Sequence, residues 1–395
     1  MYRSIPEGEP KAGKDIAIEE VRPPSDAPDG GLLVQVLYSS LDPYLRGLLR
    51  DPSQSSYFPA LEVGKPMRNA SLARVLKANN NNFKEGDVIF AMTSIQRYVQ
   101  LSAEEAKGAQ KIDADPNDKS FDIRHYLGAL GMPGLTAYSS FYEIGKPKKG
   151  ETIFVSSAAG AVGQLVGQLA LHEGLKVIGS VGTDEKLRYI QDELKFDSGF
   201  NYKKEKPGAA LKRLAPNGID IYFENVGGEH LDAAIDNMTT FGRIIACGIV
   251  AEYNAKSDDE KYGHKNLMLV VGKQLTVRGF SWTPQAYLPE RLLSQLGLAP
   301  CTCIVHYIIC RNLFHLDSFT NQSIISFRGF YCFLVQENSS FGPKHKHDHQ
   351  KNVKKWLQDG SFTAKIHELD IGEGDRGFVG MLRGENFGKA VIKVS

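Results

Sequence analysis

The chain has 395 residues, 42% of them hydrophobic, and a formal net charge of +1. Its length suffices for two domains with cores of their own, and its balanced charge gives no basis for a nucleic-acid or membrane-surface partner. No apolar run reaches the roughly 18 residues that span a bilayer, and residues 1–10 lack the apolar stretch of a secretory signal. We therefore expect a globular, cytoplasmic protein whose partner is a small molecule.

The N-terminal part of the chain carries short β-type runs separated by turns rich in Gly, Pro and Asn. These runs are residues 32–38, 73–77 and 87–90. Their spacing predicts a compact, mostly antiparallel β domain, which we assign to residues 1–128.

From about Gly131 the pattern changes to strands that alternate with helices. Buried-strand candidates are residues 151–156, 176–180, 219–224, 243–247 and 275–280. Apolar strands separated by helical stretches are typical of a doubly wound parallel sheet. This α/β unit is predicted for residues 129–282.

The first strand and helix of that unit predict a dinucleotide site. A β-branched run turns through small residues, spaced Ser157-x-x-Gly160-x-x-Gly163, into an amphipathic helix at residues 164–172. Small residues let the backbone approach a pyrophosphate, and the amides of the helix N-terminus point at its charge. A tight turn without a ligand is the alternative, but the second strand that follows favours the cofactor.

The end of the second strand indicates which cofactor binds. NAD sites usually have a carboxylate there, whereas this chain has no acid until Asp184. Lys186 could neutralise a 2′-phosphate, with Tyr202 beside it, so NADP(H) is favoured over NAD(H). In the alternative interpretations Lys186 is a solvated helix lysine and Asp184 binds the ribose, although its position next to Thr183 suits helix capping better.

Zinc ligands are scarce in the first two thirds of the chain. No cysteine precedes Cys247, and residues 1–246 offer only the widely spaced His125, His172 and His230. A catalytic zinc site of the alcohol dehydrogenase kind needs clustered thiolates and imidazoles. We predict no metal.

Residues 283–340 have an unusual composition. There is no lysine from Gln274 through Pro343, and four of the five cysteines lie here. Cys301 and Cys303, with His306 and Cys310, invite a metal interpretation, but they lack the paired spacing of structural zinc sites. We interpret the segment as an atypical apolar insertion, either a retained intron or faulty gene model, or a genuine insertion.

The C-terminal segment, residues 341–395, is predicted to return to the first domain. It contains an amphipathic helix at residues 349–359 and β character at residues 378–394. Between Lys344 and His349, histidines alternate with lysines, which repel a cation. We interpret that cluster as a solvated turn without function.

Eight motifs occur in order along the chain. They are LDPYLRG (41–47), GMPGLTAY (131–138), AAGAVG (158–163), TDEK (183–186), FNYK (200–203), FENVGG (223–228), CGIVAEYN (247–254) and GENFGK (384–389). Together they resemble the zinc-free medium-chain dehydrogenase/reductases of the leukotriene B4 dehydrogenase, prostaglandin reductase and alkenal double-bond reductase group. The resemblance covers about residues 30–282 and 341–395. It implies an α/β protein with a GroES-like β-barrel catalytic domain and a Rossmann domain.

The resemblance also implies a set of site residues. Those expected to bind the cofactor are Ala159, Gly160, Ala161, Val162 and Gly163 at the pyrophosphate, Lys186 and Tyr202 at the 2′-phosphate, Asn225 near the nicotinamide ribose, Cys247, Gly248 and Tyr253 along the nicotinamide, and Asn386 from the C-terminal segment. Tyr44 and Tyr253 resemble the tyrosines that face the reaction site. Alternatively, Tyr44 is a core residue at the barrel rim, and Tyr253 only holds the loop or the ribose.

This chemistry is hydride transfer without a metal. NADPH would deliver hydride to the β-carbon of an α,β-unsaturated aldehyde or ketone, and Tyr253, Tyr44 or a ribose hydroxyl would stabilise the enolate oxygen. The alternatives are a quinone reductase or a secondary-metabolism enoyl reductase of the same superfamily, and a cofactor-binding protein inactivated by the insertion. Relatives suggest a homodimer.

Overall fold

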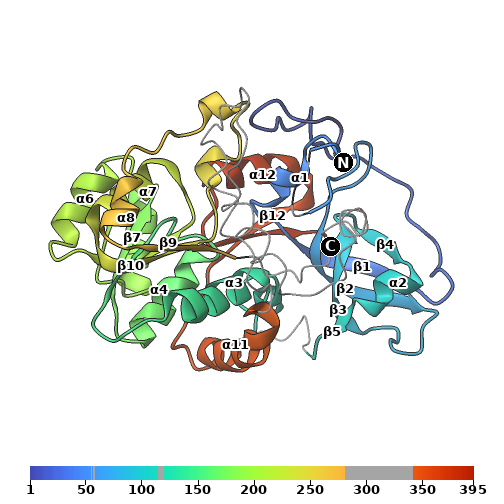
Figure 1. Ribbon diagram of the computed structural model, residues 1–395. Helices are drawn as coiled ribbons and strands as arrows, with labels where there is room; N and C mark the ends of the chain where they lie inside the picture. Colours follow the sequence, from blue (N-terminus) through green and yellow to red (C-terminus); the bar gives the residue numbers. More distant parts are fainter. Residues whose placement is uncertain (55, 57, 114–119, 281–340) are drawn as a thin grey trace, which may run out of the picture.

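The computed structural model describes residues 1–54, 56, 58–113, 120–280 and 341–395. Two separate sheets organise the chain (Figure 1). In Figure 1 the blue and cyan strands belong to one sheet, which the red C-terminal strands join, and the green and yellow strands form the other. Predictions about residues 283–340, including Cys301, Cys303 and His306, concern residues outside this description.

The first sheet joins strands from both ends of the chain. Its strands are β1 (Leu32–Ser40), β2 (Arg68–Ala78), β3 (Val88–Ser94), β4 (Tyr98–Leu101), β5 (Gln110–Lys111), β12 (Ile366–Asp370) and β13 (Lys389–Lys393). They lie in the order β12-β13-β1-β2-β3-β5, with β4 also paired to β1. All pairs are antiparallel except β12 with β13. The C-terminal strands β12 and β13 therefore belong to the same sheet as β1.

The second sheet is parallel throughout. Its strands are β6 (Thr152–Val155), β7 (Lys176–Val181), β8 (Ser198–Asn201), β9 (Ile219–Glu224), β10 (Met238–Ala246) and β11 (Thr276–Gly279). The order β11-β10-β9-β6-β7-β8 reverses direction at β6, which makes the sheet doubly wound. The GroES-like plus Rossmann architecture is confirmed.

Helices cover the sheets and connect their strands. They are α1 (Leu45–Leu48), α2 (Ala103–Lys107), α3 (Met132–Ser140), α4 (Gly163–His172), α5 (Asp184–Arg188), α6 (Pro207–Leu214), α7 (Gly228–Asn237), α8 (Met268–Gly272), α11 (Phe341–Gln358) and α12 (Gly374–Leu382). Within the described ranges, no helix combines the length and apolar character needed to cross a membrane.

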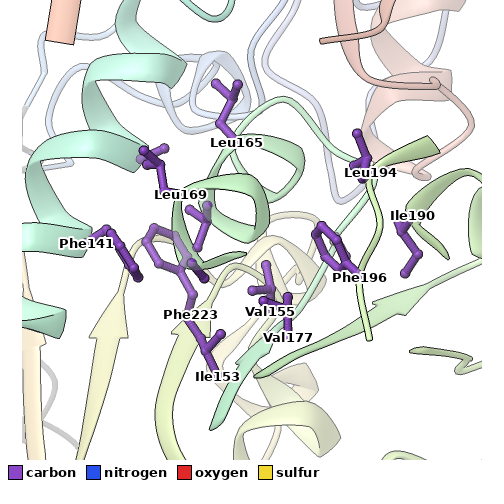
Figure 2. Close-up of a cluster of buried hydrophobic side chains, with 14 of the residues drawn as sticks. Phe141, Ile153, Val155, Leu165, Leu169, Val177, Ile190, Leu194, Phe196 and Phe223 are labelled. Atoms are coloured by element: carbon purple, nitrogen blue, oxygen red, sulfur yellow. The ribbon is translucent and has the colours of Figure 1, made fainter. Parts of the chain in front are cut away.

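The core beneath α4 fixes the position of the predicted cofactor turn. Leu165 and Leu169 on α4 belong to one buried cluster with Val155 on β6 and Phe223 on β9 (Figure 2). Fully burying one side chain of this size stabilises the folded protein by about 1.5–3 kcal/mol, because its apolar surface is removed from water. Gly167 provides close contact, because a Cβ there would lie 1.8 Å from Phe196 Cζ. The N-terminus of α4 is thus held rigidly against the sheet.

The C-terminal segment differs from its prediction in two places. Residues 378–382 complete α12, so the predicted β character is wrong there and correct only for β13. Phe378, Val379 and Met381 are buried. In so short an apolar run, their spacing fits a strand as well as a helix. β12 was not predicted from the sequence.

The histidine cluster is not a solvated turn. Lys344 to His349 lie within α11, which packs on α3. His349 is fully buried, and its Nε2 lies 2.8 Å from the Ala129 carbonyl oxygen. Burial lowers the pKa of His349 to about 4, so the ring is neutral near pH 7. His345 contacts Glu143, with Nε2 2.9 Å from Oε1. The alternating sequence concealed a helix with one buried face.

Candidate active site

The turn between β6 and α4 is built for close approach by a ligand. Ser157 takes a left-handed φ of 52°, which reverses the chain. A Cβ at Gly163 would lie 2.4 Å from the Ser157 carbonyl oxygen, and one at Gly160 would lie 3.1 Å from it. Larger side chains would therefore open the turn or fill the space above it.

The same turn presents unused backbone donors. Among the described residues, the N–H groups of Ala161, Val162 and Gly163 have no hydrogen-bond partner. They lie at the N-terminus of α4, where Val162 is the N-cap and has no capping side chain. Free amides at a helix N-terminus bind phosphate groups, so this turn fits a pyrophosphate.

The C-terminal segment closes on this turn from the other domain. The Gly388 N–H donates to the Ala159 carbonyl oxygen at 3.0 Å, and Gly160 and Gly388 form an isolated bridge. Asn386 supports this contact, because its Nδ2 donates to the Gly388 carbonyl oxygen at 2.7 Å. The structure therefore brings Asn386 to the predicted pyrophosphate turn.

Lys186 lies in the first turn of α5, behind the acid-free end of β7. It is buried, and its Nζ donates to the Gly384 carbonyl oxygen at 2.6 Å. Burial lowers the pKa of Lys186, and the nearby positive charge of Lys203 lowers it further. A buried ammonium held by a carbonyl rather than a carboxylate still has charge to offer an anion.

Tyr202 lies beside that lysine's turn. A Cβ at Gly182 would lie 3.2 Å from the Tyr202 hydroxyl oxygen. The ring is 39% exposed and packs edge-on against His230, with centroids 5.2 Å apart. Its exposed face can contact a ligand at the strand end.

Both carboxylate oxygens of Asp184 already bond to other side chains. Its Oδ1 accepts a hydrogen bond from Asn201 Nδ2 at 2.8 Å, and its Oδ2 pairs with Lys204. Thr183 is the N-cap of α5, and its hydroxyl oxygen accepts from the Lys186 N–H at 3.2 Å. This arrangement favours a structural role for Asp184 over ribose binding.

Asn225 is fixed at the end of β9. Its N–H donates to Ser156 Oγ at 2.9 Å, and its Nδ2 donates to the Ser156 carbonyl oxygen at 2.8 Å. Glu224, which the sequence analysis missed, shapes the same turn. Its Oε1 accepts from the N–H groups of Val226 at 2.6 Å and Gly227 at 2.8 Å. Burial raises the pKa of Glu224. A lone glutamate inside a strand motif gave no signal of this role.

The loop after β10 brings Cys247, Gly248 and Tyr253 to Asn225. The N–H groups of Cys247 and Gly248 both donate to the Glu224 carbonyl oxygen at 3.0 Å. A Cβ at Gly248 would lie 3.3 Å from the Tyr253 hydroxyl oxygen and 3.5 Å from the Asn225 carbonyl oxygen. The Tyr253 hydroxyl and the Asn225 carbonyl oxygen therefore both lie close to Gly248. Burial raises the pKa of Cys247 to about 12, so its thiol stays protonated and lines the site without acting as a nucleophile.

Tyr44 lies on the first domain and is the N-cap residue of α1. Its hydroxyl donates to Asn69 Oδ1 at 2.8 Å. Two residues further on, the Arg46 Nε donates to Asn254 Oδ1 at 3.0 Å, so α1 is tied to the residue next to Tyr253. This bond brings the segments that carry the two predicted reaction-site tyrosines together across the domain boundary.

Two surface hollows lie elsewhere. One, of about 470 Å³, lies between the N-terminal segment and α12, and the other, of about 290 Å³, lies at the β10–β11 edge. Neither is lined by a predicted site residue. In the part of the chain that the structure describes, no group of three or more His, Cys, Asp or Glu is placed to hold a metal ion.

Known proteins resemble the chain in both domains. A family model described as the N-terminal domain of oxidoreductase matches residues 1–111, and one described as zinc-binding dehydrogenase matches residues 161–296. The chain is 41% identical over 399 residues to NADP-dependent oxidoreductase RED1 of Cochliobolus heterostrophus, covering 100% of this chain and 97% of that protein. It is 42% identical over 276 residues to 2-alkenal reductase (NADP(+)-dependent) of Nicotiana tabacum, covering 69% and 77%.

Among solved structures, CurA from Vibrio vulnificus in complex with NADPH has a TM-score of 0.75 and 28% identity. The likeness covers 100% of this chain and 98% of that one. The chain therefore belongs to the medium-chain dehydrogenase/reductase family, in its zinc-independent group.

Proposed function

We propose that this chain, an NADP-dependent oxidoreductase, reduces the C=C bond of α,β-unsaturated aldehydes or ketones without a metal. The observation that carries the proposal is that the Tyr253 hydroxyl and the Asn225 carbonyl oxygen both lie close to Gly248, in the loop predicted to line the nicotinamide. The names of two relatives support it, the 2-alkenal reductase and (+)-pulegone reductase of Mentha piperita, the latter 41% identical over 276 residues.

The residues of the site divide the work between binding and charge stabilisation. The amides of Ala161 and Val162 would hold the pyrophosphate, and Lys186 the 2′-phosphate. When bound, NADPH supplies the hydride that reaches the β-carbon of the substrate. The Tyr253 hydroxyl would donate to the substrate carbonyl oxygen, where negative charge develops. Reduction through an enolate needs less electrophilic help than reduction of an isolated carbonyl, which fits a neutral donor.

Chelator-treated protein tests the proposal directly. We expect it to oxidise NADPH with a medium-chain enal or enone at the rate of untreated protein, because no step uses a metal. The measurement is the fall in absorbance of NADPH, with product identified as the saturated carbonyl compound. Activity that disappears on chelation and returns with zinc would reject the proposal, as would reduction of quinones alone. Cofactor binding without any turnover would instead support the inactive binding protein.

Tyr253→Phe should lower kcat for enone reduction by about tenfold, because one of the donors to the developing oxyanion is lost. The ribose hydroxyl remains as a second donor, so some activity should persist. Steady-state kinetics with NADPH affinity measured separately by fluorescence would show a loss in kcat without a matching loss of binding. An unchanged kcat with weaker NADPH binding would assign Tyr253 to the ribose alone.

A further inference from the structure

A buried chain of polar groups leads from the C-terminal strand to Tyr44. Lys389, the first residue of β13, donates from Nζ to Asp42 Oδ1 at 3.0 Å and to the Leu41 carbonyl oxygen at 2.5 Å. Asp42 Oδ2 accepts from Asn69 Nδ2 at 3.0 Å. Asn69 Oδ1 in turn accepts the Tyr44 hydroxyl proton at 2.8 Å. Lys389, Asp42 and Asn69 are each at least 96% buried.

The partners of Asn69 fix the orientation of its amide. Its Nδ2 donates to both the Ser40 carbonyl oxygen, at 2.8 Å, and Asp42 Oδ2. A flipped amide would turn its oxygen toward two other acceptors, the Ser40 carbonyl oxygen and the Asp42 carboxylate, and both of these hydrogen bonds would be lost. Oδ1 must therefore face Tyr44 as an acceptor. Because a phenol has one hydroxyl proton, a Tyr44 hydroxyl that donates to Asn69 can meet a further group only as an acceptor.

The row of buried polar groups is linked to the predicted cofactor turn through the backbone next to Lys389. Gly388, which donates to Ala159, directly precedes Lys389. Lys389 is also held by its N–H, which donates to the Lys365 carbonyl oxygen at 2.9 Å. A single stretch of backbone therefore anchors both the closing contact at the pyrophosphate turn and the ammonium that orders the chain.

We propose that Asn69, held by Asp42 and Lys389, is a positioning residue that fixes the Tyr44 ring and directs its hydroxyl proton away from the substrate. Tyr253 is then the tyrosine that donates to the substrate oxygen, and Tyr44 orients the substrate through its ring and its hydroxyl oxygen. This inference rests on the proposed function, because it takes Tyr44 to lie at the reaction site.

A double-mutant cycle tests the assignment. Asn69→Leu should lower kcat/KM for enone reduction by about tenfold, the scale of a lost buried hydrogen bond. In a Tyr44→Phe background the same substitution should change kcat/KM by less than about twofold, because Asn69 acts through the hydroxyl that is already absent. Equal effects in both backgrounds would mean a general structural role and would overturn the inference. If Asn69→Leu does not fold, Asn69→Ser serves in its place.

A matched control separates this network from buried polarity in general. Ser39 on β1 is fully buried and bonded to Ser71, with the two Oγ atoms 2.8 Å apart, in a pair separate from the side-chain bonds of Asn69. Ser39→Ala should leave kcat/KM within about twofold of the wild-type value. A tenfold loss in this variant would remove the distinction on which the cycle depends.

A second measurement needs no turnover, so it holds if the proposed function fails. In protein labelled with ¹³C at tyrosine Cζ, the resonance of Tyr44 is the one lost in Tyr44→Phe. It should move in Asn69→Leu and stay in place in Ser39→Ala, because the hydroxyl loses its acceptor only in the first. An unmoved resonance in Asn69→Leu contradicts the inference. A wild-type protein that reduces no enal or enone contradicts only the proposed function.

Discussion

Lys186→Ala is expected to weaken NADPH binding by about 2 kcal/mol, roughly thirtyfold, while NADH binding changes by less than about twofold. The buried Nζ donates to the Gly384 carbonyl oxygen and has no carboxylate partner among the described residues, so its charge is available to a 2′-phosphate. NADH lacks that phosphate. Fluorescence titration of both cofactors measures the two dissociation constants.

Lys204→Ala is the matched control for that substitution. Lys204 is an exposed lysine that pairs with Asp184. Asp184 lies in α5, the helix that also carries Lys186. Its loss should leave the ratio of the two affinities unchanged. Equal losses for NADPH and NADH in Lys186→Ala would contradict the assignment.

The pKa of Lys186 is lowered, so the free protein loses this charge at a lower pH than a surface lysine would. Preference for NADPH should therefore decline as the pH rises on the alkaline side.

Gly388→Ala should lower stability by about 3 kcal/mol or more and weaken NADPH binding with it. Gly388 has a φ of 73°, and its Cβ would lie 2.1 Å from the Lys365 carbonyl oxygen. The backbone must move, and the contact from Gly388 to Ala159 at the pyrophosphate turn is then lost. Thermal unfolding with and without NADPH measures both effects.

Gly360→Ala isolates the conformational part of that loss. Gly360 has a φ of 77°, and nothing lies within 4 Å of its Cβ position. It should lower stability by only about 1 kcal/mol, the cost of a left-handed backbone for alanine, and leave NADPH binding unchanged. Similar losses in the two variants would show that the contact between the C-terminal segment and the turn contributes little.

The parallel sheet and the turn at Gly160 and Gly163 could be predicted because their signals are local. An apolar strand, small residues and an amphipathic helix follow one another within about twenty positions. The C-terminal segment was harder to predict, because its local signal is ambiguous. Phe378 to Leu382 form a short apolar run that fits a helix or a strand, and only packing against the first domain decides between them.

The network behind Tyr44 could not be predicted from sequence patterns. Asp42 and Lys389 are 347 positions apart, and their pairing depends on β13 lying beside β1. Asn69 is the second residue of β2, and no spacing in the sequence distinguishes it from a solvated polar residue. Their roles follow from tertiary contacts, so no periodicity records them.

The position of β13 near the end of the chain also determines which sheet can be completed first during synthesis. β13 pairs with β1 over Tyr38–Ser40, next to the stretch that β4 covers. During synthesis from the N-terminus, every described strand of the parallel sheet leaves the ribosome before β13 does. That part of β1 therefore keeps an open hydrogen-bonding edge while the Rossmann domain already folds, and such edges invite pairing with other chains. A nascent chain that stalls before Lys389 would expose this edge to aggregation and would lack the contact that closes on the cofactor turn.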